Sequence, residues 1–317
     1  MILVAQDNTG DFDSIQEAID SIQMLPETIY IKKGIYHERI EIRCPFLTIE
    51  GEDPKNTVIE YDYYADMMLS DMEKRGTFRS YTMLVNTDHF TCNNLTIANT
   101  AGFGTKVGQA IALYAEGDRI TLNNCRLLGH QDTLFTGPLP NEEAHAGGFK
   151  GPTEFSERRL CRQLYKDCYI EGEVDFIFGS ATAYFENCEL HSLNRGMDIN
   201  GYVTAASTYA NQEYGYVFNH CRLTSDCPDN TVYLGRPWRI FAKTVFLNCD
   251  MGAHIREDGF HDWNKPESHD TVFYAEYHCS GKGFVPDKRA SFVQQLTDTQ
   301  AAQYTIENVL NTTSCNS

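Results

Sequence analysis

The chain has 317 residues, and its 26 Lys and Arg against 44 Asp and Glu give a formal net charge of −18 at pH 7. This acidic balance argues against nucleic acid and anionic membrane surfaces as partners, and it would repel an anionic polymer unless that polymer's charges were masked. No apolar run approaches the length of a membrane span, and the apolar content suffices for a large core. The composition is that of a soluble globular protein.

Two features bear on the compartment. The chain begins Met-Ile-Leu-Val-Ala-Gln-Asp, without a basic segment followed by a long apolar stretch, so no export signal is visible. The 11 cysteines are odd in number, and most stand beside apolar residues in strand-like runs, which favours buried free thiols over a disulfide framework. We expect a cytoplasmic protein; a secreted one whose leader had been removed would begin in the same way.

Near the N-terminus, residues 14–17 (Ser-Ile-Gln-Glu) have the spacing of a helix capping box. Ile15, Ala18, Ile19 and Ile22 then recur at helical spacing and form one apolar stripe. We predict a short amphipathic helix that covers the N-terminal end of the fold.

The middle of the chain repeats a short phrase in which a polar residue, usually Asn, precedes Cys and an apolar residue comes two positions after the Cys. The copies are Asn124-Cys-Arg-Leu127, Asp167-Cys-Tyr-Ile170, Asn187-Cys-Glu-Leu190, His220-Cys-Arg-Leu223 and Asn248-Cys-Asp-Met251, with Asn94-Leu-Thr-Ile97 as a variant. Successive copies are 20 to 43 residues apart, a loose solenoid period with inserted loops. Strand-like runs, among them residues 81–85, 110–114 and 203–206, lie between the copies.

In a coil of parallel strands, equivalent residues of successive turns stack, and Cys is compact and apolar enough for an interior column. The phrases therefore predict architecture and not catalytic thiols, since no Cys is paired with a His in a recognisable site motif. A second candidate helix begins at residues 297–300 (Thr-Asp-Thr-Gln) and runs to Leu310, at the other end of the fold. Because composition shows no break, residues 1–317 are predicted to form one domain.

Several common site motifs are absent from the sequence. It has neither a Gly-x-Ser-x-Gly elbow nor a His-Glu-x-x-His helix. The glycines of residues 102–108 lack the full spacing of a nucleotide-binding loop and predict a turn. His254, His261 and His269 lie in a polar stretch, where solvated side chains are expected. We expect neither a metal nor a cofactor.

A single acidic residue, Asp175, interrupts the apolar, strand-like run of residues 169–180. Burial of an unpaired carboxylate costs several kcal/mol, so such a residue needs a partner or a chemical role. A second carboxylate, Asp132, occurs in a Gly-His-Gln-Asp-Thr-Leu segment. Arg236, in Leu-Gly-Arg-Pro-Trp, has a guanidinium group that can bind a carboxylate through two parallel hydrogen bonds. Taken singly, Asp175 and Arg236 could be a structural ion pair, and Asp132 could cap a turn.

Five motifs occur in a fixed order along the chain. They are Gln109-Ala-Ile-Ala-Leu113, Gly129-His-Gln-Asp-Thr-Leu134, Arg162-Gln-Leu-Tyr-Lys-Asp-Cys168, Val174-Asp-Phe-Ile-Phe-Gly179 and Leu234-Gly-Arg-Pro-Trp238. Read together, they resemble the pectin methylesterases, the pectinesterases of carbohydrate esterase family 8. The likeness extends from residues 4–12 to residues 273–277 and the closing helix.

The resemblance implies an all-β fold, a right-handed single-stranded parallel β-helix with short capping helices at both ends. It also implies hydrolysis of methyl esters on the C6 carboxyl of galacturonate units. Carried over by motif, Asp175 is the nucleophile and Asp132 the general acid and then base. Gln109 and Gln131 would stabilise the oxyanion, and Arg236 would hold Asp175.

Trp238 and Phe178 are candidates for contact with the sugar, and Thr100 is a weaker one. The expected substrate is a methylated galacturonan or oligogalacturonide, bound by a monomer. Two alternatives remain at this point. Pectate lyases and polygalacturonases also use a β-helix, with calcium-binding acids or with clustered acids around a glycosidic bond, and a non-catalytic carbohydrate-binding solenoid is the third possibility.

Between Phe135 and Arg162 the chain carries a longer connection than many family members have, rich in Gly, Pro and charged residues. We predict that this segment, residues 136–161, is a surface loop that walls one end of the cleft and limits the enzyme to short or terminal substrates. A cytoplasmic enzyme could meet only imported oligogalacturonides, and an acidic one should prefer heavily methylated ones.

Overall fold

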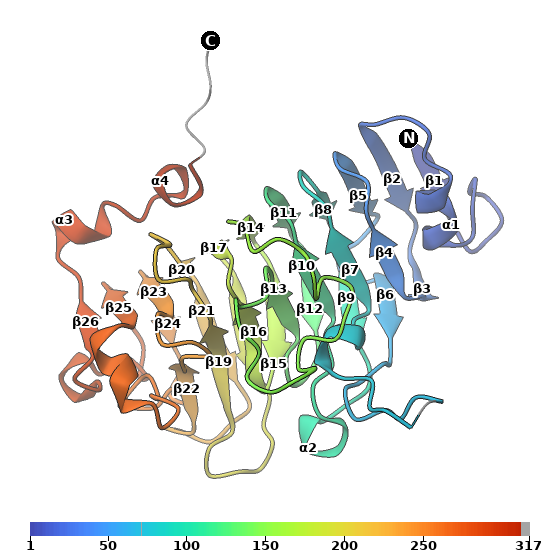
Figure 1. The fold of residues 1–317 in the computed structure, drawn as a ribbon. Helices are drawn as coiled ribbons and strands as arrows, with labels where there is room; N and C mark the ends of the chain where they lie inside the picture. Colours follow the sequence, from blue (N-terminus) through green and yellow to red (C-terminus); the bar gives the residue numbers. More distant parts are fainter. Residues whose placement is uncertain (71, 312–317) are drawn as a thin grey trace.

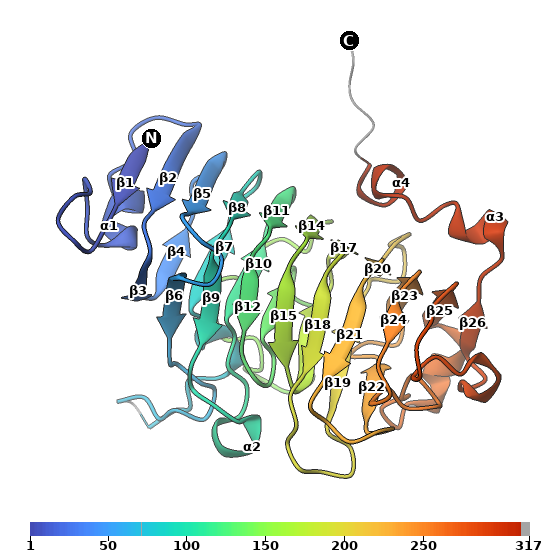
Figure 2. The same ribbon diagram turned by 180° about the vertical axis from the view of Figure 1, so that it is seen from behind.

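The computed structural model describes residues 1–70 and 72–311, which form a stack of coils (Figure 1). In each turn the chain passes through a strand of one sheet, then of a second and then of a third, before it returns to the first sheet one level further along. Neighbouring strands within each sheet pair in parallel. The described residues therefore form a parallel β-helix, with the N-terminal strands at one end and the C-terminal strands at the other (Figure 2).

The three sheets of the described residues are named A, B and C here. Sheet A contains, in spatial order, β1 (Ile2–Val4), β2 (Glu27–Ile31), β5 (Leu47–Gly51), β8 (Thr91–Asn93), β11 (Ile120–Asn123), β14 (Arg162–Lys166), β17 (Thr182–Glu186), β20 (Tyr216–Asn219), β23 (Lys243–Leu247), β25 (Phe273–Tyr277) and β26 (Val293–Gln295). Sheet B contains β3 (Gly34–His37), β6 (Thr57–Tyr61), β9 (Thr96–Asn99), β12 (Arg126–Leu128), β15 (Tyr169–Gly172), β18 (Glu189–Ser192), β21 (Arg222–Ser225) and β24 (Asp250–Met251). Sheet C contains β4 (Ile40–Ile42), β7 (Met83–Asn86), β10 (Leu113–Glu116), β13 (Leu134–Thr136), β16 (Val174–Gly179), β19 (Gly201–Ala206) and β22 (Val232–Gly235).

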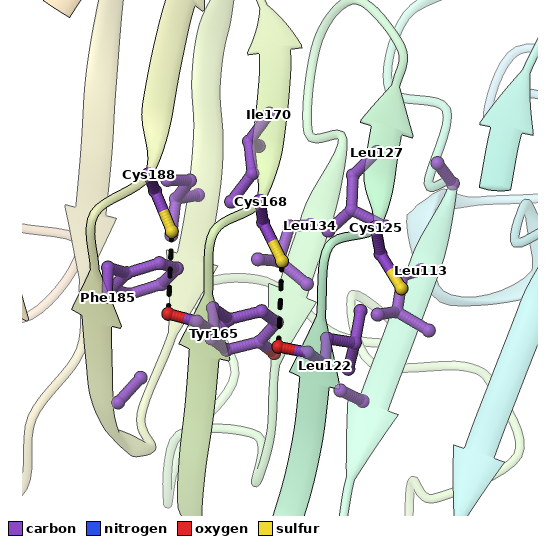
Figure 3. Packing of buried hydrophobic residues seen from close by; sticks show 14 of the residues in the cluster. Leu113, Leu122, Cys125, Leu127, Leu134, Tyr165, Cys168, Ile170, Phe185 and Cys188 are labelled. Carbon is purple, nitrogen blue, oxygen red and sulfur yellow. Dashed lines mark hydrogen bonds between the residues drawn. The ribbon is translucent and has the colours of Figure 1, made fainter. Parts of the chain in front are cut away.

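The recurring cysteine phrase forms the turn between sheets A and B. Its cysteines are buried in the interior, where Figure 3 shows Cys125, Cys168 and Cys188 in a row beside the stacked rings of Tyr165 and Phe185. Their thiols donate to backbone carbonyls, as Cys188 does to the carbonyl of Tyr165 at 3.4 Å. All ten cysteines among the described residues are free thiols. The predicted interior column is confirmed.

The backbone conformation explains why a polar residue precedes each cysteine. In every copy its φ is positive, between 50° and 56°, in the left-handed region that Asn, Asp and His tolerate best. The side chains also join successive coils: Asn124 donates to Asn94 at 2.7 Å, and Asn187 donates to Asp167 at 2.5 Å. The phrase therefore combines a turn conformation, a ladder of side-chain hydrogen bonds and an apolar interior position.

Helix α1 (Ile15–Asp20) packs against the N-terminal end of the core through Ile15, Ala18 and Ile19, as predicted. Its cap is only half of the expected capping box. The Ser14 hydroxyl accepts from the N–H of Glu17 at 3.3 Å, whereas the carboxylate that reaches the first turn is that of Glu38, which accepts from the N–H groups of Ile15 and Gln16. A residue from the connection between β3 and β4 thus replaces the local glutamate.

The single helix expected after residue 297 is two short helices, α3 (Asp298–Ala301) and α4 (Ile306–Leu310). The predicted capping box of Thr297 and Gln300 is present, but Thr305 starts a second helix by accepting from the N–H of Asn308 at 3.2 Å. Val309 and Leu310 pack on outward-facing residues of sheet A, among them Val217 and Leu247. These helices therefore cover an outer face of the coil as well as its C-terminal part (Figure 1).

The remaining short helices lie in loops: α2 (Gly104–Val107) and the 3-10 turns Thr77–Arg79, Pro266–Asp270 and Pro286–Lys288. Among residues 1–70 and 72–311, no helix has the length and apolar content that a bilayer crossing requires.

Candidate active site

The outer face of sheet C gathers polar side chains from coils that are far apart in the sequence. Gln109 precedes β10, Gln131 and Asp132 precede β13, Asp175 lies within β16, and Arg236 directly follows β22. All five line one cavity of ≈ 210 Å³. The parallel stacking of coils therefore brings the five predicted polar residues into a single site.

Asp132 and Asp175 occupy equivalent places on neighbouring coils. Leu134 pairs with Ile177, so the two aspartates, each two positions earlier, are one strand spacing of about 4.8 Å apart along the stack. The pairing of β16 with β19 shifts register beside Asp175. Both aspartates have a left-handed backbone, with φ of +65° and +52°, a conformation that Asp adopts more readily than most residues.

Asp175 forms a bidentate ion pair with Arg236. Arg236 donates from Nε to Oδ1 at 2.8 Å and from Nη2 to Oδ2 at 2.7 Å, while Asp175 is only 7 % exposed. The guanidinium is itself held between two aromatic rings, 3.9 Å from the ring centre of Tyr202 and 3.7 Å from that of Trp263. This fixes the orientation of the Asp175 carboxylate and favours its ionised form.

Asp132 has a different environment. It is 8 % exposed, and its carboxylate has no hydrogen-bond partner among the described residues. Burial raises its pKa well above the ordinary value, and the negative charge of Asp175 raises it further, against the opposing charge of Arg236. Burial also raises the pKa of Asp175, but Arg236 opposes this by charge and by hydrogen bonds. The pKa of Asp132 is therefore raised further than that of Asp175.

Aromatic side chains form the walls of the cavity. Phe178 and Trp238, both predicted substrate contacts, line it with ring centres 5.7 Å apart, and Phe78 lies 6.4 Å from Trp238. Thr100 lies elsewhere: it is exposed, its hydroxyl donates to the carbonyl of Tyr61 at 3.3 Å, and it does not line this cavity. The structure thus brings together seven of the eight predicted site residues.

The sequence did not identify several residues of the site. Tyr202 belongs to a strand extending one of the predicted runs, and Trp263 lies in the polar stretch that was assigned to solvated loops. The only available signal was that Trp263 is one of just two tryptophans in the chain. Their stacking on Arg236 depends on tertiary contacts, which local sequence does not reveal.

The long connection between β13 and β14 forms part of the cavity wall. Ala144, His145, Gly148 and Phe149 line it, and Phe149 packs 6.3 Å from Trp238 between ring centres. The predicted role of this segment as a wall of the cleft agrees with these contacts, although its first residues, 137–140, are buried and not at the surface.

A buried carboxylate bound by an arginine, beside a second buried carboxyl group with a more strongly raised pKa, provides groups that could serve in nucleophilic and acid–base catalysis. No cluster of three or more His, Cys, Asp or Glu side chains in the described part of the chain is arranged to hold a metal ion. Fold and site together thus define a parallel β-helix hydrolase with a carboxylate pair.

Comparison with known proteins specifies the family. The pectinesterase family model matches residues 1–139 and 157–313. Pectinesterase 31 of Arabidopsis thaliana is 34 % identical over 96 % of this chain and 90 % of its own length, and pectinesterase 2 of Olea europaea is 36 % identical over 96 % and 76 %. The crystal structure of a pectin methylesterase in complex with a hexasaccharide superposes with a TM-score of 0.81 at 31 % identity, over 99 % of this chain and 97 % of that one. The chain belongs to the pectinesterase family, and its fold is the right-handed parallel β-helix expected.

These matches overturn the cytoplasmic location expected from the sequence. The plant relatives are pectinesterases secreted to the cell wall, which conflicts with a cytoplasmic enzyme. The inference from free thiols failed because the cysteines fill an interior column, where packing selects them and burial shields them from oxidants. The expectation of an imported oligogalacturonide substrate depended on the cytoplasmic location and is therefore wrong as well.

Proposed function

We propose that this chain demethylates galacturonate units of pectin through an acyl-enzyme on Asp175, with Asp132 as the acid and then the base. In the first half, a carboxylate oxygen of Asp175 attacks the ester carbonyl carbon at C6. The amide groups of Gln109 and Gln131 donate to the oxyanion that develops. Asp132 protonates the departing methoxide, which leaves as methanol, and an anhydride remains on Asp175.

In the second half, Asp132 is a carboxylate and can take a proton from water. That water attacks the anhydride, the C–O bond to Asp175 breaks, and the galacturonate leaves as the free acid. Asp175 regains its charge beside Arg236, and Asp132 regains its proton, so the cycle closes without a co-reactant. Asp132 thus changes from acid to base between the two steps, while Asp175 is first the nucleophile and then the leaving group.

The observation that carries this assignment is the unequal environment of the two neighbouring carboxyl groups. Asp175 has two hydrogen bonds from Arg236, whereas Asp132 is buried without a partner in the described residues. A structural ion pair would explain Asp175 and Arg236 but not an adjacent buried carboxyl without a hydrogen bond.

The test is methanol release from pectin and from methylated oligogalacturonides, comparing wild type with Asp175→Asn while unsaturated and reducing ends are monitored. Methanol release that the substitution abolishes, without chain cleavage, supports the assignment. Chain cleavage without methanol would contradict it and favour a lyase or glycosidase.

The connection between β13 and β14 supports a finer proposal on substrate length. Residues 140–156 fall outside the match to the family model and are therefore an insertion, called the insertion below. It lines the cavity through Ala144, His145, Gly148 and Phe149, and it is tied to the rest of the fold by the Lys150–Glu73 ion pair at 2.9 Å and by a hydrogen bond of 2.7 Å from Arg239 to the carbonyl of Glu142. We expect the insertion to restrict long polymer and to favour short or terminal segments, bound by one copy of the chain.

A further inference from the structure

Glu173 is a buried carboxylate that the proposed mechanism does not use. It lies two positions before Asp175, between β15 and β16, and is 0 % exposed. Its Oε1 lies 3.1 Å from Nδ1 of His130, and its Oε2 accepts from the backbone N–H of Gly104 at 3.1 Å. Because a buried carboxylate is costly to retain, these two contacts need an explanation.

Both contacts lead to the amides that line the cavity. His130 is the residue before Gln131, and Gly104 begins α2, whose last turn ends at Gly108, directly before Gln109. The backbone of Glu173 strengthens the first link, because its N–H donates to the carbonyl of His130 at 2.8 Å. One carboxylate therefore connects the loop of Gln109, the turn of Gln131 and the strand of Asp175.

The approach of Gly104 to Gln131 is unusually close. A Cβ added to Gly104 would lie 2.6 Å from the Cβ and 2.6 Å from Oε1 of Gln131, so no larger residue fits without a shift. With its amide oxygen against Gly104, Gln131 has its NH₂ group available to the cavity that it lines. An oxyanion requires the NH₂ group and not the carbonyl.

We infer that Glu173 is a positioning residue that holds Gly104 and His130 so that Gln131 presents its amide NH₂ to the oxyanion. This inference rests on the proposed function, because Gln131 must act as a donor in the reaction. Glu173 does not touch the cavity, and its contribution passes through Gln131. A misplaced oxyanion donor stabilises the transition state less and therefore lowers kcat. It has little effect on KM, because the donor contributes little to binding of the substrate itself.

The test is a double-mutant cycle on methanol release from a methylated oligogalacturonide. Glu173→Gln keeps the size of the side chain and removes its charge. We expect it to lower kcat about 10- to 100-fold, with KM changed by less than about twofold, because loss of one oxyanion donor costs about 10²–10³ in rate. In a Gln131→Ala background the same substitution should change kcat by less than about twofold, since the group through which it acts is gone. Glu171→Gln, at a neighbouring carboxylate whose partner is the Tyr169 hydroxyl, is the matched control and should match wild type.

An unchanged kcat in Glu173→Gln, or an equal loss in both backgrounds, would overturn the inference, and so would a Gln131→Ala variant as active as wild type. If Glu173→Gln does not fold, His130→Ala tests the same link, because the His130 side chain is 22 % exposed and its removal leaves the core intact. Its loss of kcat should likewise disappear in the Gln131→Ala background. Failure of the proposed function is distinguishable, since wild type itself would then release no methanol.

Discussion

Asp132 combines burial, the absence of a hydrogen-bond partner in the described residues and a neighbouring negative charge. Such a carboxyl group lowers stability when it is charged, and no hydrogen bond from the described residues offsets this cost.

We predict that Asp132→Asn abolishes methanol release and stabilises the fold at neutral pH. The folded-state pKa of Asp132 is raised, so the proton is held more tightly in the folded than in the unfolded chain. The resulting stability is present in full below the unfolded pKa and is lost as pH rises through the folded pKa. Asn has no proton to lose, so the variant should gain about 1–3 kcal/mol over wild type at pH 7.

Denaturant unfolding of both proteins at pH 4 and pH 7 measures this difference. The difference in free energy of unfolding between the two proteins should be larger at pH 7 than at pH 4, because the higher pH favours ionisation of the wild-type Asp132 carboxyl. A variant that is less stable than wild type at pH 7 would mean that Asp132 has a stabilising partner.

At the scale of elements, the sequence predicts the coil but not the position of the insertion. The Cys phrase predicted a stacked interior column because Cys is compact and apolar, and the structure added that the polar residue before each Cys makes a left-handed turn between sheets A and B. The insertion has no repeat and no periodicity, so its position against Phe78 and Trp238 came only from the structure.

We predict that replacing residues 141–151 with a short Gly-Ser linker raises kcat/KM for pectin relative to that for short oligogalacturonides. Removal of Phe149 and of the backbone around it opens one wall of the cavity to longer chains. Lys150→Ser, which removes only an exposed ion pair with Glu73, is the control and should keep the wild-type preference, because such pairs contribute little. An unchanged ratio between polymer and oligomers in the shortened variant would reject a role of the insertion in substrate length.

The insertion is also anchored by a titratable group. The hydroxyl of Thr153, which is fully buried, donates to the carboxylate of Glu116 in β10 at 2.7 Å and contacts the hydroxyl of Tyr114 at 2.5 Å. Burial raises the pKa of Glu116 to about 7, against the opposing effect of the Thr153 hydrogen bond. The anchor therefore changes charge close to neutral pH.

We predict that ionisation of Glu116, as pH rises through about 7, favours release of the insertion, because the cost of burying the charge exceeds the gain from the Thr153 hydrogen bond. Because the folded pKa lies above the unfolded value, the stabilisation is complete below the unfolded pKa and is lost above the folded one. Hydrogen exchange of residues 140–156 should be faster relative to the core at pH 8 than at pH 6, after correction for the intrinsic rate. Glu116→Gln should show no such change, and an equal pH response in both proteins would contradict the prediction.

At the scale of the whole molecule, the formal charge of −18 opposes a substrate that becomes more negative with each ester removed. We predict that kcat/KM rises with the degree of methylation at fixed chain length. The difference should shrink on raising the salt from 0.01 M to 0.1 M, because the screening length falls from about 30 Å to about 10 Å. Activity that instead rises as methylation falls would show that local contacts outweigh the net charge.

The sequence by itself determined the coil, because a solenoid repeats one local solution: a left-handed polar residue, an apolar interior position and short strands between them. It also singled out Asp175, which interrupts an apolar run, whereas Asp132 and Arg236 were assigned their roles by the resemblance of the ordered motifs. The sequence did not give the helix boundaries: the predicted final helix is two short helices, because Thr305 is the N-cap of a second one.

Only the tertiary structure decided how the site is supported. The rings of Tyr202 and Trp263 on Arg236, the link from Glu173 to Gly104, and the wall made by the insertion all join segments tens of residues apart. Stacking of coils sets which segments meet, and the inserted loops between strands vary in length without a local signal. Such contacts depend on the register of whole coils, which local composition and periodicity do not encode.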